Sequence, residues 1–214
     1  MKTDLSLYAI LDPARSHDRD LAALALHAAR GGATILQYRD KRASTREMVE
    51  RARAIRAALD GSNVPFLVND RVDVALASGA DGVHVGQSDM DARDARRLLG
   101  PDAIVGLTIK TRDHAEAAPL DCLDYVCIGG VFETASKENP TAIGLDGWRD
   151  VAAHFREHAP QLPVGAIAGI DTSNAADVIR AGADGVAVIS ALFMADDVEA
   201  AARELARTIE EARS

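Results

Sequence analysis

Short apolar runs alternate along the chain with longer amphipathic segments, from one end of the sequence to the other. The short runs are typical of strands buried on both faces, and the longer segments repeat their apolar positions with the period of a helix. Strands are predicted at residues 5–11, 32–41, 65–68, 82–85, 104–110, 125–132, 164–170 and 185–192, and helices at 20–30, 44–59, 72–77, 92–99, 112–118, 148–158, 175–181 and 198–212. About eight strand–helix units at this length predict an α/β fold, a single-domain (β/α)8 TIM barrel over residues 1–214.

One short pattern occurs twice, with one glycine that ends a helix and a second that opens a strand. Residues 78–85 are SGADGVHV, residues 181–188 are AGADGVAV, and residues 31–34 form a fainter copy. Such repetition favours a barrel of similar units but carries no chemistry by itself. Ser44 and Glu47 form the spacing of a capping box ahead of the second predicted helix.

The composition limits the kinds of partner. A net charge of −9 argues against nucleic acid and against an anionic membrane, because both require a basic surface. We find no run of eighteen apolar residues and no signal-peptide pattern at the N-terminus, so we expect a cytoplasmic protein. Cys122 and Cys127 lack metal spacing and are expected to be buried apolar residues. The oligomeric state is left open, with a homo-oligomer among the alternatives.

The second predicted strand ends in the charged segment Gln37, Tyr38, Arg39, Asp40 and Lys41. Side chains alternate between the two faces of an extended chain, so Gln37, Arg39 and Lys41 should point one way and Tyr38 and Asp40 the other. Two cations and an amide on one face would grip an anion. The alternative is a strand that ends in solvated charges.

The other strands also end in polar residues, and chemistry in such barrels sits at these ends. The groups are Asn69 and Asp70; His84, Gln87 and Asp89; Thr108 and Lys110; and Thr134, Ser136 and Lys137. Only four of the 24 basic residues are lysine, and three of those four follow strands. Asp70 and Asp89 are either helix N-caps or ligands, with equal weight given to both. Two carboxylates among cations suit Mg²⁺ shared with phosphate oxygens, which implies a diphosphate ligand.

A second anion site is indicated by the last two predicted strands. Gly169 and the turn at Ile189 and Ser190 would leave backbone N–H groups free to bind a phosphate, unless the small residues serve only close packing. We find no nucleophile paired with a base, and His84 has no evident partner. Lys41 or Lys110 could form a Schiff base, but the surrounding carboxylates and cations favour diphosphate handling.

Taken together, these segments resemble the thiamine-phosphate synthase family over essentially the whole chain. The matching segments are 37–41 (QYRDK), 68–70 (VND), 82–89 (GVHVGQSD), 106–108 (GLT), 124–126 (DYV), 134–137 (TASK), 169–170 (GI) and 188–190 (VIS). The resemblance implies a TIM barrel that joins 4-amino-2-methyl-5-diphosphomethylpyrimidine to a thiazole phosphate and releases pyrophosphate. It also implies that no base is needed, because the thiazole nitrogen captures a pyrimidine cation formed as diphosphate leaves.

The resemblance implies three groups of site residues. The pyrimidine diphosphate would be held by Gln37, Tyr38, Arg39, Asp40, Lys41, Asn69, Thr108 and Lys137, with Tyr38 and Asp40 contributing backbone. Mg²⁺ would be bound by Asp70 and Asp89. The thiazole phosphate would be held by Thr134, Ala135, Ser136, Gly169, Ile189 and Ser190. The chain departs from the family pattern at Gly130 and Glu133, which replace prolines, at Ala168, which replaces glycine, and at Lys110, where many members have histidine.

Two other functions are compatible with these residues. A related thiazole tautomerase would use a histidine as acid and base, but the matching region offers Lys110. A non-catalytic barrel that binds thiazole phosphate as a sensor would have no use for paired metal carboxylates.

Overall fold

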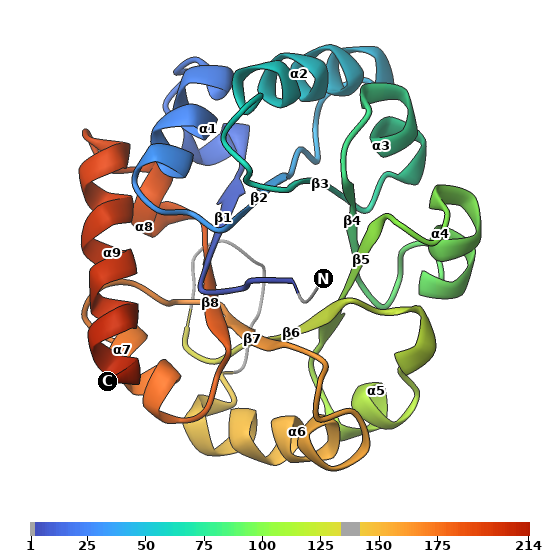
Figure 1. Ribbon diagram of the computed structural model, residues 1–214, viewed down its shortest axis with the longest axis vertical. Coiled ribbons are helices and arrows are strands. Elements are labelled where there is room, and N and C mark those ends of the chain that lie inside the picture. The colour runs from blue at the N-terminus through green and yellow to red at the C-terminus, as the bar shows by residue number, and fades with distance from the viewer. Residues whose placement is uncertain (1–2, 134–141) are drawn as a thin grey trace.

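The computed structural model of the chain describes residues 3–133 and 142–214. Eight parallel strands form a closed barrel in chain order, and Figure 1 shows the helices arranged around it. The strands are β1 (Leu7–Leu11), β2 (Ile35–Tyr38), β3 (Phe66–Asn69), β4 (Gly82–Val85), β5 (Ile104–Ile109), β6 (Tyr125–Gly129), β7 (Val164–Ile167) and β8 (Gly185–Val188). The predicted (β/α)8 barrel is confirmed.

The eight helices that the sequence pattern predicts are present, and three short ones in the described residues, η1, η2 and α8, are additional. They are η1 (Pro13–Arg15), α1 (Leu21–Arg30), α2 (Thr45–Ala58), α3 (Val72–Ser78), α4 (Ala92–Leu99), α5 (Arg112–Glu116), η2 (Leu120–Cys122), α6 (Gly144–His158), α7 (Ala175–Arg180), α8 (Ser190–Phe193) and α9 (Val198–Arg213). The capping box is present, since the backbone N–H of Ser44 donates to Glu47 and that of Glu47 donates to the Ser44 hydroxyl. Among the described helices, none has both the length and the apolar character that crossing a bilayer requires.

Four predicted strands run three or more residues too far at their C-terminal ends: those predicted to end at residues 41, 132, 170 and 192 end at 38, 129, 167 and 188. The last strand stops at Val188, and the buried residues Leu192 and Phe193 belong to the short helix α8. An apolar run alone cannot distinguish a strand from one buried helical turn. The sixth strand stops at Gly129 because Gly130 has a φ of 83°, which breaks the extended conformation.

Alternation along each strand divides the core into two layers. On β1, Leu7, Ala9 and Leu11 pack outward against the helices, whereas Tyr8 and Ile10 belong to a smaller cluster that fills the barrel. This cluster also contains Leu67 and Tyr125 from β3 and β6, among others. The interior is therefore a packed core, and a ligand must bind at an end of the barrel.

The repeated sequence pattern has a structural role at the N-terminal end of the barrel. In both full copies an aspartate accepts a hydrogen bond from the first backbone N–H of the preceding strand: Asp81 from Phe66 and Asp184 from Val164, each at 2.7 Å. Thr34, in the fainter copy, accepts one from Leu7 at 3.1 Å. The repeat thus satisfies backbone donors that the sheet leaves unpaired.

Candidate functional site

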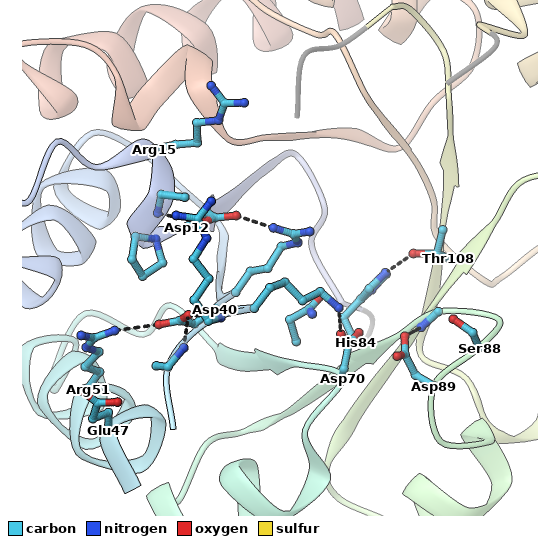
Figure 2. A pocket seen from close by; sticks show the side chains of 18 of the residues that line it. Asp12, Arg15, Asp40, Glu47, Arg51, Asp70, His84, Ser88, Asp89 and Thr108 are labelled. Atoms are coloured by element: carbon cyan, nitrogen blue, oxygen red, sulfur yellow. Dashed lines mark hydrogen bonds and ion pairs between the residues drawn. The ribbon is translucent and has the colours of Figure 1, made fainter. Parts of the chain in front are cut away.

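A pocket of 1310 Å³ opens at the C-terminal ends of the strands (Figure 2). It is lined by site residues that the sequence predicts at the ends of different strands: Arg39, Asp40, Lys41, Asn69, Asp70, Asp89 and Thr108. Further lining residues, among others, are Asp12, Arg15, Arg42, Arg51, His84, Gln87 and Lys110. Cations and carboxylates from the ends of β1 to β5 therefore share one cavity.

Each of the two predicted cations is held by a carboxylate. Arg39 pairs with Asp12, which is only 7% exposed and also accepts the N–H of Ala14 at 2.9 Å. Lys41 pairs with Asp70. Sequence reasoning missed Asp12, although it directly follows the first strand as the other polar residues follow theirs. Asp12 fixes the direction of Arg39 toward the pocket, and a charge-assisted contact of this kind restricts the guanidinium more than water would.

Asp70 and Asp89 are ligand candidates, and the structure excludes the N-cap alternative for both. Helix α3 begins after Arg71 without a side-chain cap, and α4 is capped by Asp91. Asp70 has a φ of 61°. Burial raises the pKa of Asp70; Lys41 opposes the rise and the neighbouring Asp89 carboxylate adds to it. Figure 2 shows both carboxylates on the side of the pocket where His84 and Thr108 also lie.

Asp89 is held in place by the turn after β4. Its Oδ2 accepts the backbone N–H of Gly86 at 2.8 Å, while Gln87 donates to the carbonyl of Thr108 at 2.7 Å. One oxygen of the Asp89 side chain is thus bound by the turn. Because the Asp89 carboxylate contributes to the raised pKa of Asp70, the two side chains are close enough for a cation between them to be favourable.

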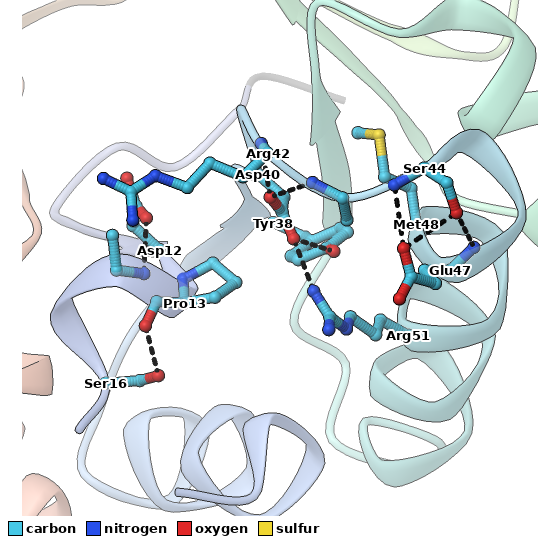
Figure 3. A network of polar contacts seen from close by, with 12 residues as sticks. Asp12, Pro13, Ser16, Tyr38, Asp40, Arg42, Ser44, Glu47, Met48 and Arg51 are labelled. Atoms are coloured by element: carbon cyan, nitrogen blue, oxygen red, sulfur yellow. Dashed lines mark hydrogen bonds and ion pairs between the residues drawn. The ribbon is translucent and has the colours of Figure 1, made fainter. Parts of the chain in front are cut away.

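Tyr38 packs in the outer layer of the core, as the alternation predicts, whereas Asp40 follows the end of β2 and lines the pocket, against the expectation that its side chain points away from it (Figure 3). The Tyr38 hydroxyl and Arg51 Nη1 each donate to Asp40 Oδ2 at 2.8 Å, and the N–H groups of Arg42 and Ala43 donate to Oδ1 at 2.9 and 3.0 Å. Burial opposes ionisation of Asp40, but these hydrogen bonds outweigh it and lower the pKa of the carboxyl. Asp40 therefore organises the loop that carries Arg39 and Lys41.

We expect Asp40→Asn to destabilise the fold by about 2 kcal/mol at pH 7, because an amide nitrogen cannot accept these hydrogen bonds. A lowered folded-state pKa stabilises the protein above the unfolded pKa of about 3.9, and this contribution is lost as the pH falls through the folded value. The difference between wild type and variant should therefore shrink below about pH 4 in urea unfolding. Asp73→Asn, in an exposed pair with Arg71, is the control and should change stability by less than about 1 kcal/mol. An undiminished difference for Asp40→Asn at low pH would contradict the prediction.

Gln37 points into the barrel, on the opposite face from Tyr38, as predicted. It is 1% exposed, lies below the pocket, and donates its amide N–H to the Tyr8 hydroxyl. The expectation that His84 lacks a partner is wrong: its Nδ1 lies 2.9 Å from the Tyr125 hydroxyl and its Nε2 lies 2.7 Å from the Thr108 hydroxyl. Sequence reasoning missed these contacts because the three residues come from different strands.

The residues assigned to the second anion site are brought together only in part. Gly169, Ile189 and Ser190 lie after β7 and β8, outside the described lining of the pocket. Gly169 has a φ of 65°, and an added Cβ would lie 2.4 Å from the carbonyl oxygen of Glu133. Only glycine fits this turn. The predicted contacts Thr134, Ala135, Ser136 and Lys137 lie outside the described residues.

Ala168, beside Gly169, has a φ of 94°, a conformation that an L residue with a Cβ rarely adopts. We expect Ala168→Gly to stabilise the fold by about 1 kcal/mol, because it removes the steric conflict. Calorimetry should show a rise in Tm of about 2–4 °C. Ala166→Gly is the matched control in the same strand: Ala166 is fully buried with ordinary backbone geometry, so the change should lower stability. A lower Tm for Ala168→Gly would show that the strain is not real.

Comparisons with known proteins agree with one another. The model of the thiamine monophosphate synthase family matches residues 7–192. The thiamine-phosphate synthase of Agrobacterium fabrum is 56% identical over 99% of this chain and 96% of its own, and that of Chloroflexus aurantiacus is 48% identical over 94% and 91%. The solved structure of a thiamine phosphate pyrophosphorylase from Pyrococcus furiosus has a TM-score of 0.86 and 37% identity, and covers 100% of this chain and 99% of its own.

Proposed function

From the premise that the chain belongs to the thiamine monophosphate synthase family, we propose that it condenses 4-amino-2-methyl-5-diphosphomethylpyrimidine with thiazole phosphate. The products are thiamine phosphate and pyrophosphate. The observation that supports this most is the gathering of Arg39, Lys41, Asp70 and Asp89 around one cavity at the C-terminal end of the barrel. Paired carboxylates beside cations suit a ligand that carries a diphosphate.

The proposed reaction breaks the C–O bond between the pyrimidine methylene and the diphosphate. The electron pair leaves with the diphosphate, and the lone pair of the thiazole nitrogen then forms the new C–N bond. Negative charge therefore accumulates on the leaving group, and Arg39 and Lys41, which line the pocket, would stabilise it. Lys137 would add a third cation from its loop. No step requires a general base.

The donor set fits Mg²⁺. The described residues contain no cluster of three or more acidic, histidine or cysteine side chains suited to a metal, and the candidate ligands are the neighbouring carboxylates of Asp70 and Asp89. Mg²⁺ is commonly held by one or two carboxylates, with water and substrate phosphate oxygens completing its octahedron. When bound, Mg²⁺ would neutralise charge on the departing diphosphate. Asp70 and Asp89 would hold it, and the Lys41 ammonium would then turn from Asp70 to the diphosphate.

We assign the remaining contacts by the same family relation. Gln37, Asn69 and Thr108, with the backbone of Tyr38 and Asp40, would hold the pyrimidine end of the first substrate. The thiazole phosphate would be bound by Thr134, Ala135, Ser136, Gly169, Ile189 and Ser190. The positive φ of Gly169 supports this assignment, because consecutive backbone N–H groups around such a turn form a concave anion site.

Incubation of the purified protein with both substrates and Mg²⁺, with mass spectrometry of the products, tests the proposed activity. Thiamine phosphate and pyrophosphate should appear in equal amounts, and a chelator should abolish both until Mg²⁺ is restored. No product at any Mg²⁺ concentration would refute the proposal. Calorimetry of the pyrimidine diphosphate with and without Mg²⁺ separates the enzyme from a sensor of thiazole phosphate, because such a sensor predicts no metal-linked binding.

A further inference from the structure

Five polar side chains form a continuous hydrogen-bond chain across the barrel, directly beneath the pocket. Gln37 Nε2 donates to the Tyr8 hydroxyl, which lies 2.7 Å from the Tyr125 hydroxyl. Tyr125 in turn lies 2.9 Å from His84 Nδ1, and His84 Nε2 lies 2.7 Å from Thr108 Oγ1. The five residues come from β2, β1, β6, β4 and β5. Figure 2 shows the contact between His84 and Thr108 at the pocket end.

The fold provides specific space for this chain. The Tyr125 ring lies against Gly106 on β5, where a Cβ would be 2.1 Å from the tyrosine Cζ and 2.4 Å from its hydroxyl oxygen. The rings of His84 and Tyr125 stack with centroids 5.5 Å apart, and Tyr8 meets Tyr125 edge-on at 5.7 Å. Any side chain at Gly106 would displace the central hydroxyl. The arrangement therefore depends on a glycine whose φ is unexceptional, which indicates that the glycine is there for the tyrosine.

Both tyrosines of this hydrogen-bond chain, Tyr8 and Tyr125, keep their protons at neutral pH. Tyr8 and Tyr125 are fully buried, and burial is the main cause that raises the pKa of each hydroxyl above its ordinary value. Each therefore has one proton to donate and can accept one hydrogen bond from its neighbour. A buried hydroxyl whose proton finds no acceptor is costly. The five side chains should therefore adopt the arrangement in which each buried hydroxyl donates its proton to a neighbouring acceptor.

With Gln37 Nε2 as the first donor, one direction gives each of these four contacts one donor and one acceptor. The Tyr8 oxygen accepts from Gln37, so its proton goes to Tyr125, and the Tyr125 proton goes to His84 Nδ1. A neutral imidazole with an occupied Nδ1 lone pair carries its proton on Nε2, which then donates to Thr108. The Thr108 hydroxyl has accepted within the chain, so its own proton is available to the pocket that it lines.

We propose that this chain is a one-way hydrogen-bond relay that fixes His84 as the Nε2–H tautomer and makes Thr108 a donor to an acceptor atom of the bound substrate. Tyr8 and Tyr125 are its positioning residues. The substrate part of the proposal rests on the proposed function, whereas the tautomer is a property of the protein alone. A pocket hydroxyl with fixed polarity selects an acceptor, such as a ring nitrogen or a phosphate oxygen, at the end of β5 and disfavours a donor there.

The test is the tautomer of His84 in the full-length protein without substrate. Long-range ¹H–¹⁵N spectra at about pH 8, where an ordinary histidine is neutral, report which ring nitrogen carries the proton. We expect the proton on Nε2 in wild type. In Tyr125→Phe, which removes the donor to Nδ1, we expect a mixture of both tautomers and a fall in kcat/KM of about tenfold, equivalent to about 1.4 kcal/mol. Tyr38→Phe, a buried tyrosine outside the relay, should leave the tautomer unchanged.

Tyr8→Phe is the second variant and decides the matter if Tyr125→Phe fails to fold. It removes the donor to Tyr125, so it should also loosen the tautomer preference. A wild-type proton on Nδ1 would overturn the proposal, and so would an unchanged Nε2–H tautomer in both variants. If the tautomer behaves as expected but no thiamine phosphate forms, the proposed function is wrong while the relay stands.

Discussion

Replacing Arg39 by methionine is expected to lower kcat/KM for the proposed condensation at least about 10²-fold, because the variant lacks a preorganised positive charge at the leaving group. Steady-state pyrophosphate release measures this loss. The same change leaves the buried residue Asp12 without its ion-pair partner. We therefore also expect a loss of about 3 kcal/mol in the free energy of unfolding, since an uncompensated buried charge is strongly destabilising.

A double substitution separates these two effects. Combining Arg39→Met with Asp12→Asn removes the unpaired charge, so most of the stability should return while the rate stays low. Arg53→Ala is the control for a lost arginine elsewhere: Arg53 donates to the carbonyl of Ala77 near the C-terminal end of α3, away from the pocket lining, and its loss should leave the rate unchanged. If the stable double variant also recovered the rate, the role of Arg39 in charge stabilisation would be refuted.

Replacing Gly82 by alanine is expected to destabilise the barrel by about 4 kcal/mol, the range of severe core substitutions. A Cβ at this position would lie 1.9 Å from the carbonyl oxygen of Ile104 and 2.7 Å from its carbonyl carbon and nitrogen. These are backbone atoms of the neighbouring strand β5, so no side-chain rotation can relieve the contact. Thermal unfolding should show a Tm lower by about 10 °C or more.

The repeat supplies a matched control three residues away. Gly79 has a φ of 70° and no atom within 4 Å of an added Cβ, so Gly79→Ala should cost only the backbone conformation, about 1 kcal/mol. The second copy repeats the pair: Gly182 is open with a φ of 104°, and a Cβ on Gly185 would lie 1.7 Å from the carbonyl oxygen of Leu5. Equal losses of stability for the alanine variants at Gly79 and Gly82, or at Gly182 and Gly185, would contradict this explanation.

The fold and part of the site follow from local patterns, which is why the sequence predicts them. Buried parallel strands and amphipathic helices each leave a periodic signal, and polar residues directly after the strands identify Arg39, Asp70 and Asp89 as candidates. Boundaries at residues 189–192 are missed because burial of Leu192 and Phe193 in a helical turn looks like a strand. The relation to known synthases, rather than the pattern, supplies the identity of the substrates.

The rest of the site depends on contacts between residues far apart in sequence. Tyr8 and Tyr125 are separated by 117 positions, and nothing local to either predicts that their hydroxyls meet. The same holds for Asp12 and Arg39, 27 positions apart. A signal for Tyr8 was present nonetheless: it alternates with outward-facing residues on β1, and a tyrosine in a buried strand needs a hydrogen-bond partner for its hydroxyl.

The two copies of the repeat open β4 and β8, and these strands stand four places apart in a closed barrel of eight. The rim at that end therefore has an approximate twofold symmetry, with β1–β4 and β5–β8 as its halves. The opposite end does not share it. Arg39, Lys41, Asp70 and Asp89 all follow strands of the first half, whereas Gly169, Ile189 and Ser190 follow strands of the second. The two halves are thus alike at the N-terminal end of the barrel, where the repeat lies, and differ at the C-terminal end, where the substrates are expected to bind. The two substrates would meet at the boundary between the halves.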